Sequence, residues 1–124
     1  MSNVNEVVAS YIAAWNERDP KKRRELIAKT WTDGGSYIDA HRHGVGHDEI
    51  DAMIAGVQER FVGYCFGLVS GIEAHNGYVR FTWAAGGAPG APLYFRGTDF
   101  GIRGEDGRLV SIAGFTDAAP ASAA

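Results

Sequence analysis

The stretch Leu93–Ile102, with the sequence LYFRGTDFGI, decides how the second half of this chain folds. Aromatic and aliphatic residues dominate it, as in a β-strand, and one acidic residue, Asp99, interrupts them. Because side chains alternate between the two faces of a strand, Asp99 shares its face with Gly97 and Gly101, and Arg96 lies on the other. Burying an unpaired charge is costly. We therefore expect Asp99 to be shielded and hydrogen-bonded, with space beside it for a ligand or another chain segment.

Strand signals extend from this stretch in both directions. Asn76-Gly77 is a strong two-residue hairpin signal, and Gly104–Gly107 marks a second turn. Residues 86–92, rich in Gly and Pro, form a wide loop between the hairpins. The predicted antiparallel strands cover residues 64–75, 78–85, 93–103 and 108–117.

Helical patterns occupy the first half of the chain. Apolar residues recur at helical spacing from Val4 to Trp15, and Asn3 with Glu6 can form a capping box. Asp19 can cap a second helix that begins at Pro20 and runs towards Trp31. Residues 33–35 read as a turn, 36–39 as a short strand, 40–46 as a polar loop, and 47–61 as a third helix. Helices followed by strands indicate an α+β fold, with the helices on one face of the sheet.

Bulk composition excludes several classes of protein. The chain has 124 residues, of which 45% are hydrophobic and 22% charged, and no apolar run approaches the length of a membrane span. Its net charge of −3 argues against nucleic-acid binding, and the basic run Lys21–Arg24 is interpreted as a solvated face. A single cysteine, Cys65, and no visible signal peptide favour the cytoplasm. We expect one domain over residues 1–117 and a flexible low-complexity tail over residues 118–124.

The order of elements, together with several short phrases, resembles the NTF2-like superfamily, and within it the SnoaL-like and ketosteroid isomerase-like domains. The phrases are YIAAWN at 11–16 followed by Asp19, YID at 37–39, GHDEI at 46–50, and GRLVSI at 107–112 followed by Gly114 and Phe115. The resemblance covers about residues 4–117. It implies a cone-shaped fold in which three N-terminal helices pack on a curved antiparallel sheet and enclose a pocket.

The same resemblance implies roles for three residues. A Tyr on the first helix and a protonated Asp on a late strand donate hydrogen bonds to the substrate carbonyl in the isomerases, and these positions are Tyr11 and Asp99 here. A second Asp at the end of the first strand moves the proton, and this position is Asp39. The family's usual proline after this Asp is Ala40 here. The alternative interpretation makes Tyr11 a core residue that simply bonds Asp99.

Several further residues are predicted to line the pocket, chiefly because they are aromatic or lie near Asp39. They are Trp15, Trp31, Tyr37, His41, Ile54, Trp83, Phe95 and Phe115. In an extended segment Asp39, His41 and His43 would point the same way and could hold a divalent metal, but solvated histidines are the preferred interpretation. We therefore predict neither a metal nor another cofactor.

The function that follows is a small-molecule pocket protein, with an isomerase-like or cyclase-like proton transfer on a small apolar or ketone-containing molecule as the first hypothesis. A non-catalytic protein that binds apolar ligands is the alternative. An epoxide hydrolase is a third possibility, although the Asp-Arg-Asp set of such NTF2-like enzymes cannot be assembled from this sequence. Phe100 and Ile102 lie on the strand face opposite Phe95, so we also expect a homodimer that covers the outer face of the sheet.

Overall fold

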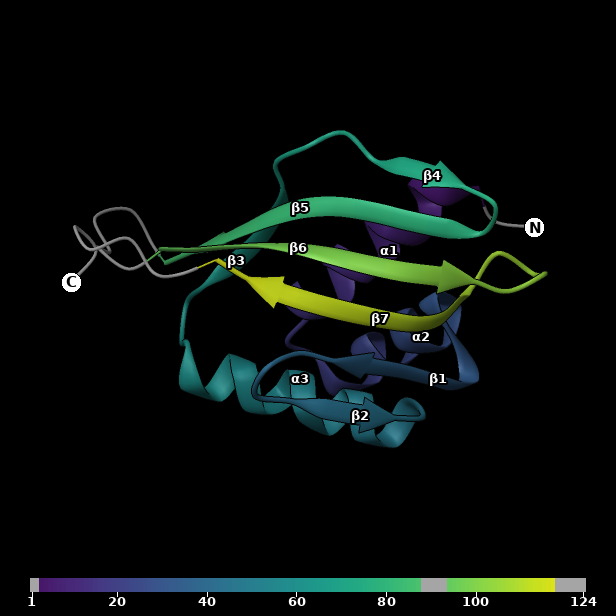
Figure 1. The fold of residues 1–124 in the computed structure, drawn as a ribbon. Helices are drawn as coiled ribbons and strands as arrows, with labels where there is room; N and C mark the ends of the chain where they lie inside the picture. Colours follow the sequence, from purple (N-terminus) through teal and green to yellow (C-terminus); the bar gives the residue numbers. More distant parts are fainter. Residues whose placement is uncertain (1–2, 88–93, 118–124) are drawn as a thin grey trace.

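The computed structural model describes residues 3–87 and 94–117, which form three helices and a curled seven-stranded sheet (Figure 1). The helices are α1 (Val4–Asn16), α2 (Pro20–Thr30) and α3 (His47–Arg60). The strands are β1 (Trp31–Ile38), β2 (His43–Val45), β3 (Cys65–Leu68), β4 (Glu73–His75), β5 (Tyr78–Gly86), β6 (Tyr94–Arg103) and β7 (Leu109–Thr116). All three helices lie on one face of the sheet, which confirms the predicted α+β architecture.

The sheet is mixed rather than wholly antiparallel. Its strand order is β2-β1-β7-β6-β5-β3, with β4 also paired to β5. Every pair is antiparallel except β1 with β7, which run parallel in the register Tyr37 opposite Ile112. Local turn signals specify hairpins, but no turn joins β1 to β7, so the sequence carries no local sign of this pairing.

The helix starts follow the predicted caps. The Asn3 side chain accepts a hydrogen bond from the Glu6 amide at 2.9 Å and donates one to the Glu6 carboxylate at 3.1 Å, which is a reciprocal capping arrangement. The Asp19 side chain accepts from the Lys22 amide at 2.9 Å, and Pro20 occupies the first helical position. These caps satisfy amide groups that would otherwise lack partners.

Three strand boundaries differ from the prediction. The turn expected at residues 33–35 is part of β1, and a short strand, β2, replaces the end of the polar loop expected at 40–46. The long strand expected over 64–75 is interrupted between β3 and β4, where the Ser70 hydroxyl accepts a hydrogen bond from the Thr82 amide of β5. The Ser70 side chain thus takes the place of a backbone hydrogen bond between strands at this point. Parts of the predicted loop at 86–92, and the whole predicted tail, lie outside the described residues.

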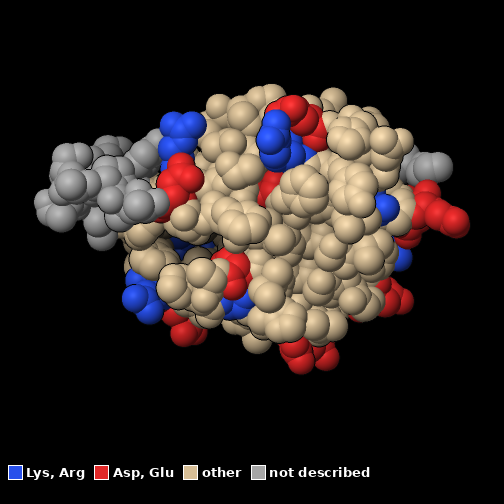
Figure 2. All heavy atoms as spheres, in the orientation of Figure 1, with Lys and Arg blue, Asp and Glu red and all other residues tan. Residues whose placement is uncertain are grey.

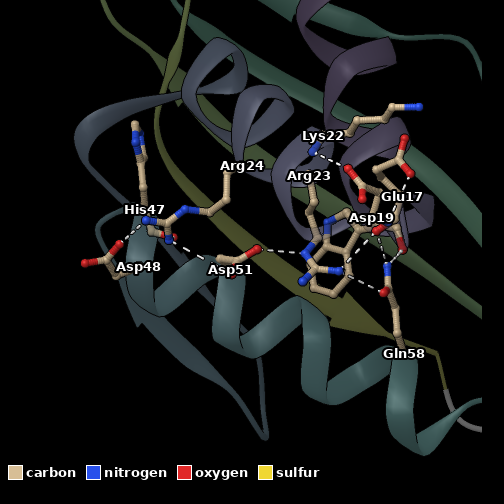
Figure 3. Close-up of polar contacts among 10 residues, drawn as sticks. Glu17, Asp19, Lys22, Arg23, Arg24, His47, Asp48, Asp51 and Gln58 are labelled. Atoms are coloured by element: carbon tan, nitrogen blue, oxygen red, sulfur yellow. Dashed lines mark hydrogen bonds and ion pairs between the residues drawn. The ribbon is translucent and has the colours of Figure 1, made fainter.

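A buried arginine ties the three helices together (Figure 3). Arg23 is only 4% exposed; its Nε donates to Asp51 Oδ1 at 2.7 Å, and its Nη1 donates to Gln58 Oε1 and to the Glu17 carbonyl. Gln58 donates in turn to the carbonyls of Trp15 and Glu17. The interpretation of the run Lys21–Arg24 as a solvated face is therefore wrong for Arg23, because its partners lie on other helices.

Arg23→Lys is expected to lower the free energy of unfolding by about 2 kcal/mol, because an ammonium can keep the Asp51 ion pair but not the planar fork that reaches Gln58 and Glu17. Urea denaturation followed by circular dichroism measures the change. Arg24→Lys is the matched control, since the Arg24–Asp48 pair is largely exposed and its change should leave stability nearly unaltered. Equal effects of the two substitutions would contradict the role given to Arg23.

Along the described part of the chain, no helix is long and apolar enough to cross a membrane.

Candidate active site

A cavity of about 570 Å³ lies between the helices and the strands of the sheet that line it. Aromatic side chains from α1, β1, β3, β5, β6 and the segment after α3 make up nearly half of the lining residues. A few polar groups interrupt this apolar lining, as in most small-molecule sites. The lining residues are Tyr11, Ile12, Trp15, Tyr37, Asp39, His41, Arg42, Val57, Arg60, Phe61, Tyr64, Phe66, Trp83, Ala85, Phe95, Asp99 and Thr116.

Asp99 is the central polar group of this wall. It is 2% exposed, and each of its carboxyl oxygens has one donor. The Tyr11 hydroxyl lies 2.5 Å from Oδ2, and the Trp83 indole nitrogen donates to Oδ1 at 3.0 Å. The prediction that Asp99 is shielded and hydrogen-bonded is confirmed. Its bond to Tyr11 is also the contact that the alternative interpretation of Tyr11 as a core residue predicts. Trp83 is a further partner that the sequence did not reveal.

Two glycines make room for this arrangement. A Cβ atom at Gly97 would lie 2.5 Å from the Trp83 ring, so only glycine lets the indole reach Asp99 across the β5–β6 pair. A Cβ atom at Gly114 would lie 2.9 Å from both Asp99 Oδ1 and the Tyr37 hydroxyl oxygen. The missing side chain at Gly114 therefore lets Tyr37 approach Asp99.

Burial controls the protonation of these groups. Desolvation raises the pKa of Asp99 to about 6, although the hydrogen bonds from Tyr11 and Trp83 partly oppose the shift and Asp39 adds a small charge repulsion. Desolvation also raises the pKa of Tyr11 and of Tyr37 above the ordinary value, with the Asp99 charge as the next cause, so both hydroxyls stay protonated. The site thus holds two phenol donors and one carboxyl that titrates near neutral pH.

Asp39 lies on the same cavity wall with a different set of partners. Its Oδ2 accepts from the Tyr37 hydroxyl at 2.7 Å, and its Oδ1 accepts from the backbone amides of His41 and Arg42, both at 2.8 Å. Arg42 Nη1 lies 3.6 Å from Oδ2, which is longer than a charge-assisted hydrogen bond. The lone pair of Oδ2 that faces Arg42 is therefore the one position where this carboxylate has no close donor.

Solved structures with a similar fold include SnoaL-like and NTF2-like proteins. A crystal structure from Agrobacterium tumefaciens str. C58, of a protein of the SnoaL-like family provisionally named an isomerase, is 32% identical and matches 95% of this chain and all of that one with a TM-score of 0.86. The chain belongs to the SnoaL-like family. No protein-family model matches the sequence, and no curated protein does.

More distant structures show the same fold. A protein from Jannaschia sp. CCS1, provisionally named a SnoaL-like polyketide cyclase, is 16% identical over 94% of this chain and 90% of its own, with a TM-score of 0.71. An NTF2-like protein of unknown function from Exiguobacterium sp. 255-15 is also 16% identical, over 90% of this chain and 98% of its own, with a TM-score of 0.70. At these identities the likeness concerns the fold alone.

Three of the residues predicted for the pocket of this SnoaL-like domain lie elsewhere. Trp31 and Ile54 are fully buried in the core, because α2, α3 and the sheet close over them. Phe115 is 68% exposed, since it alternates with the inward-facing Gly114 and Thr116 on β7 and so points to the outer face. The structure places the other eight on the cavity wall: Tyr11, Trp15, Tyr37, Asp39, His41, Trp83, Phe95 and Asp99.

Sequence reasoning missed a group of cavity residues that come from the end of α3, the turn after it and β3. Arg60, Phe61, Tyr64 and Phe66 line the cavity there, and Phe61 packs edge-on against Phe95 with ring centroids 5.2 Å apart. Three of the four are aromatic, and Gly63, whose φ of +83° favours glycine, is the local signal in the sequence for the turn before β3. Arg42 was also missed as a cavity residue.

The metal alternative has no counterpart in residues 3–87 and 94–117. In these ranges no three His, Cys, Asp or Glu side chains come together as a metal site would require. His43 is exposed on β2, whereas Asp39 and His41 face the cavity.

Proposed function

We propose that this SnoaL-like protein is an enzyme that moves a proton next to a carbonyl group of a small, mainly apolar ketone, as ketosteroid isomerases and polyketide cyclases do. One observation carries the proposal: a buried carboxyl, Asp99, lies bonded to a phenol donor, Tyr11, on the wall of an apolar cavity that also holds a second carboxylate, Asp39. The provisional name of the relative from Agrobacterium tumefaciens, an isomerase, agrees with this reaction class.

Whether Tyr11 can donate a hydrogen bond to a ligand depends on whether Asp99 is protonated. When Asp99 is ionised, it accepts from Tyr11 and Trp83, so the Tyr11 proton is already in use. When Asp99 is protonated, its own hydrogen can point to the Tyr11 oxygen, and the Tyr11 proton becomes free for a ligand oxygen. Such a donor stabilises the negative charge that develops on the carbonyl oxygen of an enolising ketone.

Asp39 is proposed as the base. It would take a proton from the carbon next to the carbonyl, while the C–H electron pair forms the enolate double bond and the carbonyl electrons move to the oxygen held by Tyr11. If solvent replaces the proton on Asp39 by a deuteron, delivery of that deuteron to the same carbon gives exchange, and delivery of the proton to a conjugated carbon gives isomerisation. Asp39 can receive the proton only through the Oδ2 lone pair that faces Arg42, so Arg42 must move aside in the reacting complex.

The experiment is exchange of the methyl protons of 2-acetonaphthone in D₂O, followed by NMR, with and without protein. Wild type is expected to accelerate exchange. Tyr11→Phe should slow exchange by about 10²-fold, because protonated Asp99 still donates a hydrogen bond to the ligand oxygen. Removal of the base Asp39 should slow exchange more. Binding without any acceleration of exchange would support the alternative, a non-catalytic protein for apolar ligands.

The epoxide hydrolase alternative has less support. That activity needs an arginine between two carboxylates, but in the described residues Arg42 pairs only with Asp39, and Asp99 pairs with Tyr11 and Trp83.

The cellular location stays a prediction. The single cysteine of the chain, Cys65, favours the cytoplasm.

A homodimer through the outer face of the sheet is part of the proposal. Tyr78, Phe100, Ile102 and Phe115 lie on three neighbouring strands and are 40 to 68% exposed, and Figure 2 shows few charged groups on this face. An apolar patch that spans several strands favours a partner surface. Light scattering at micromolar concentration should give the mass of two chains, and Phe100→Glu should give one. A clean monomer for the wild-type protein would contradict the dimer.

A further inference from the structure

The exposure of its lining residues gives the cavity an inner end and a mouth. Asp99 and Tyr11 are each 2% exposed, whereas the Arg42 side chain is 29% exposed and Arg60 is an exposed residue. Figure 1 shows the turn between β1 and β2, which carries Arg42, at the same end of the molecule as the C-terminal end of α3, which carries Arg60. Two guanidinium groups therefore border the open end, and the Tyr11 hydroxyl and the Asp99 carboxyl lie deep.

The charge of these two guanidinium groups is poorly balanced. Arg60 forms no ion pair with any described residue, and its Cζ lies 5.6 Å from the centre of the Phe61 ring. Arg42 reaches Asp39 only at 3.6 Å, and that carboxylate already accepts three closer hydrogen bonds. By contrast, Arg23 holds its carboxylate partner at 2.7 Å. The chain as a whole has a net charge of −3, but the mouth of its cavity carries positive charge that ion pairs within the protein do not fully neutralise.

The geometry points to an anionic ligand: the cavity takes a planar organic acid whose apolar body lies among the aromatic rings and whose carboxylate pairs with Arg60 and Arg42 at the mouth. The inference rests on the proposed function for its premise that a small molecule occupies this cavity. It adds the chemical class of that molecule.

The lining favours a carboxylate on a flat apolar body over a compact polar anion such as phosphate. Aromatic rings of Trp15, Phe66, Trp83 and Phe95 supply flat apolar contacts, which a small inorganic anion would leave unused. A guanidinium fork matches the two oxygens of a carboxylate, and it does so best where water is partly excluded. A carboxylate that binds Arg42 would also draw it away from Asp39 and uncover the one lone pair that the proposed base needs.

The test compares two ligands that differ at one group, the anion 6-acetyl-2-naphthoate and its uncharged methyl ester. Both carry the same ring system and the same enolisable methyl ketone. Quenching of tryptophan fluorescence gives the Kd of each ligand for wild type, Arg60→Gln, Arg42→Gln and the control Arg96→Gln. Arg96 is exposed on β6 and is not among the cavity residues.

Wild type is expected to bind the acid at least about tenfold more tightly than the ester, because a charge-assisted pair at a partly shielded site contributes at least that much. Arg60→Gln and Arg42→Gln should each reduce this preference to about threefold or less, and Arg96→Gln should keep it. Raising the salt concentration should also reduce it.

Equal affinity for acid and ester, or a preference that survives both substitutions, would overturn the inference. Exchange of the methyl protons, measured on the same samples, separates this outcome from failure of the proposed function. If acid and ester bind equally well and exchange is accelerated, the proposed function stands and only the inference of an anionic ligand is overturned. If the protein prefers the acid, the preference depends on Arg60 and Arg42, and exchange is not accelerated, the anionic ligand is supported and the proposed enzymatic function is overturned. If neither compound binds, both are overturned.

Discussion

Asp39→Asn is expected to lower the rate of ketone proton exchange by about 10³-fold and to leave ligand affinity within about threefold of wild type, because it removes the base and keeps the size of the side chain. The turn between β1 and β2, which follows Asp39, should keep its conformation. The Asn oxygen can still accept from the amides of His41 and Arg42, and the Tyr37 hydroxyl can rotate to accept from the new NH₂ group. The measurement is the exchange rate of 2-acetonaphthone in D₂O at saturating ligand.

Glu105→Gln is the matched control, since Glu105 is an exposed carboxylate in the turn between β6 and β7. It should leave the exchange rate unchanged. Full activity of Asp39→Asn would place the base elsewhere, and His41, which also lines the cavity, would be the next residue to test.

Asp99→Asn is expected to change how stability depends on pH. Because burial raises the pKa of Asp99 from 3.8 to about 6, the folded state holds this proton over a pH range in which the unfolded chain has released it. Stability contributed by this group is therefore fully present below pH 3.8 and is lost as pH rises towards 6. The loss amounts to about 3 kcal/mol for a shift of this size.

Asn cannot titrate and resembles the protonated carboxyl, since its oxygen can accept from Trp83 and its NH₂ can donate to Tyr11. Relative to wild type, the variant should therefore gain about 2 kcal/mol between pH 4 and pH 7, because part of the effect is already present at pH 4. Urea denaturation of both proteins at the two pH values gives this difference, and the contributions of titratable groups that do not interact with Asp99 cancel. A difference that does not change with pH would show that Asp99 titrates in the folded protein as it does in the unfolded chain.

Sequence reasoning succeeded where the signal is local. The caps at Asn3 and Asp19, the hairpin at Asn76-Gly77 and the inward orientation of Asp99 all follow from spacing along one element, and the structure has each of them. The family resemblance supplied the overall architecture, because it encodes how elements distant in sequence come together.

The errors share a different cause. The parallel pairing of β1 with β7, the burial of Arg23 and the contact of Trp83 with Asp99 all depend on segments that are far apart in sequence. Phe115 was assigned to the cavity for its aromatic character, but alternation along β7 points it outward. Residue type alone did not separate core from cavity for Trp31, which is as aromatic as the rings that line the pocket.

The account depends most on the claim that Tyr11 and Asp99 hold the oxygen of a bound enolate. A crystal structure with 2-naphthol, a flat molecule whose hydroxyl oxygen imitates an enolate, tests this directly. We predict the ring within the aromatic cavity and its oxygen within hydrogen-bond distance of the Tyr11 hydroxyl, Asp99 or both. Naphthol bound with its oxygen turned to the mouth and no contact to either residue, or no naphthol in the cavity at all, would contradict the account.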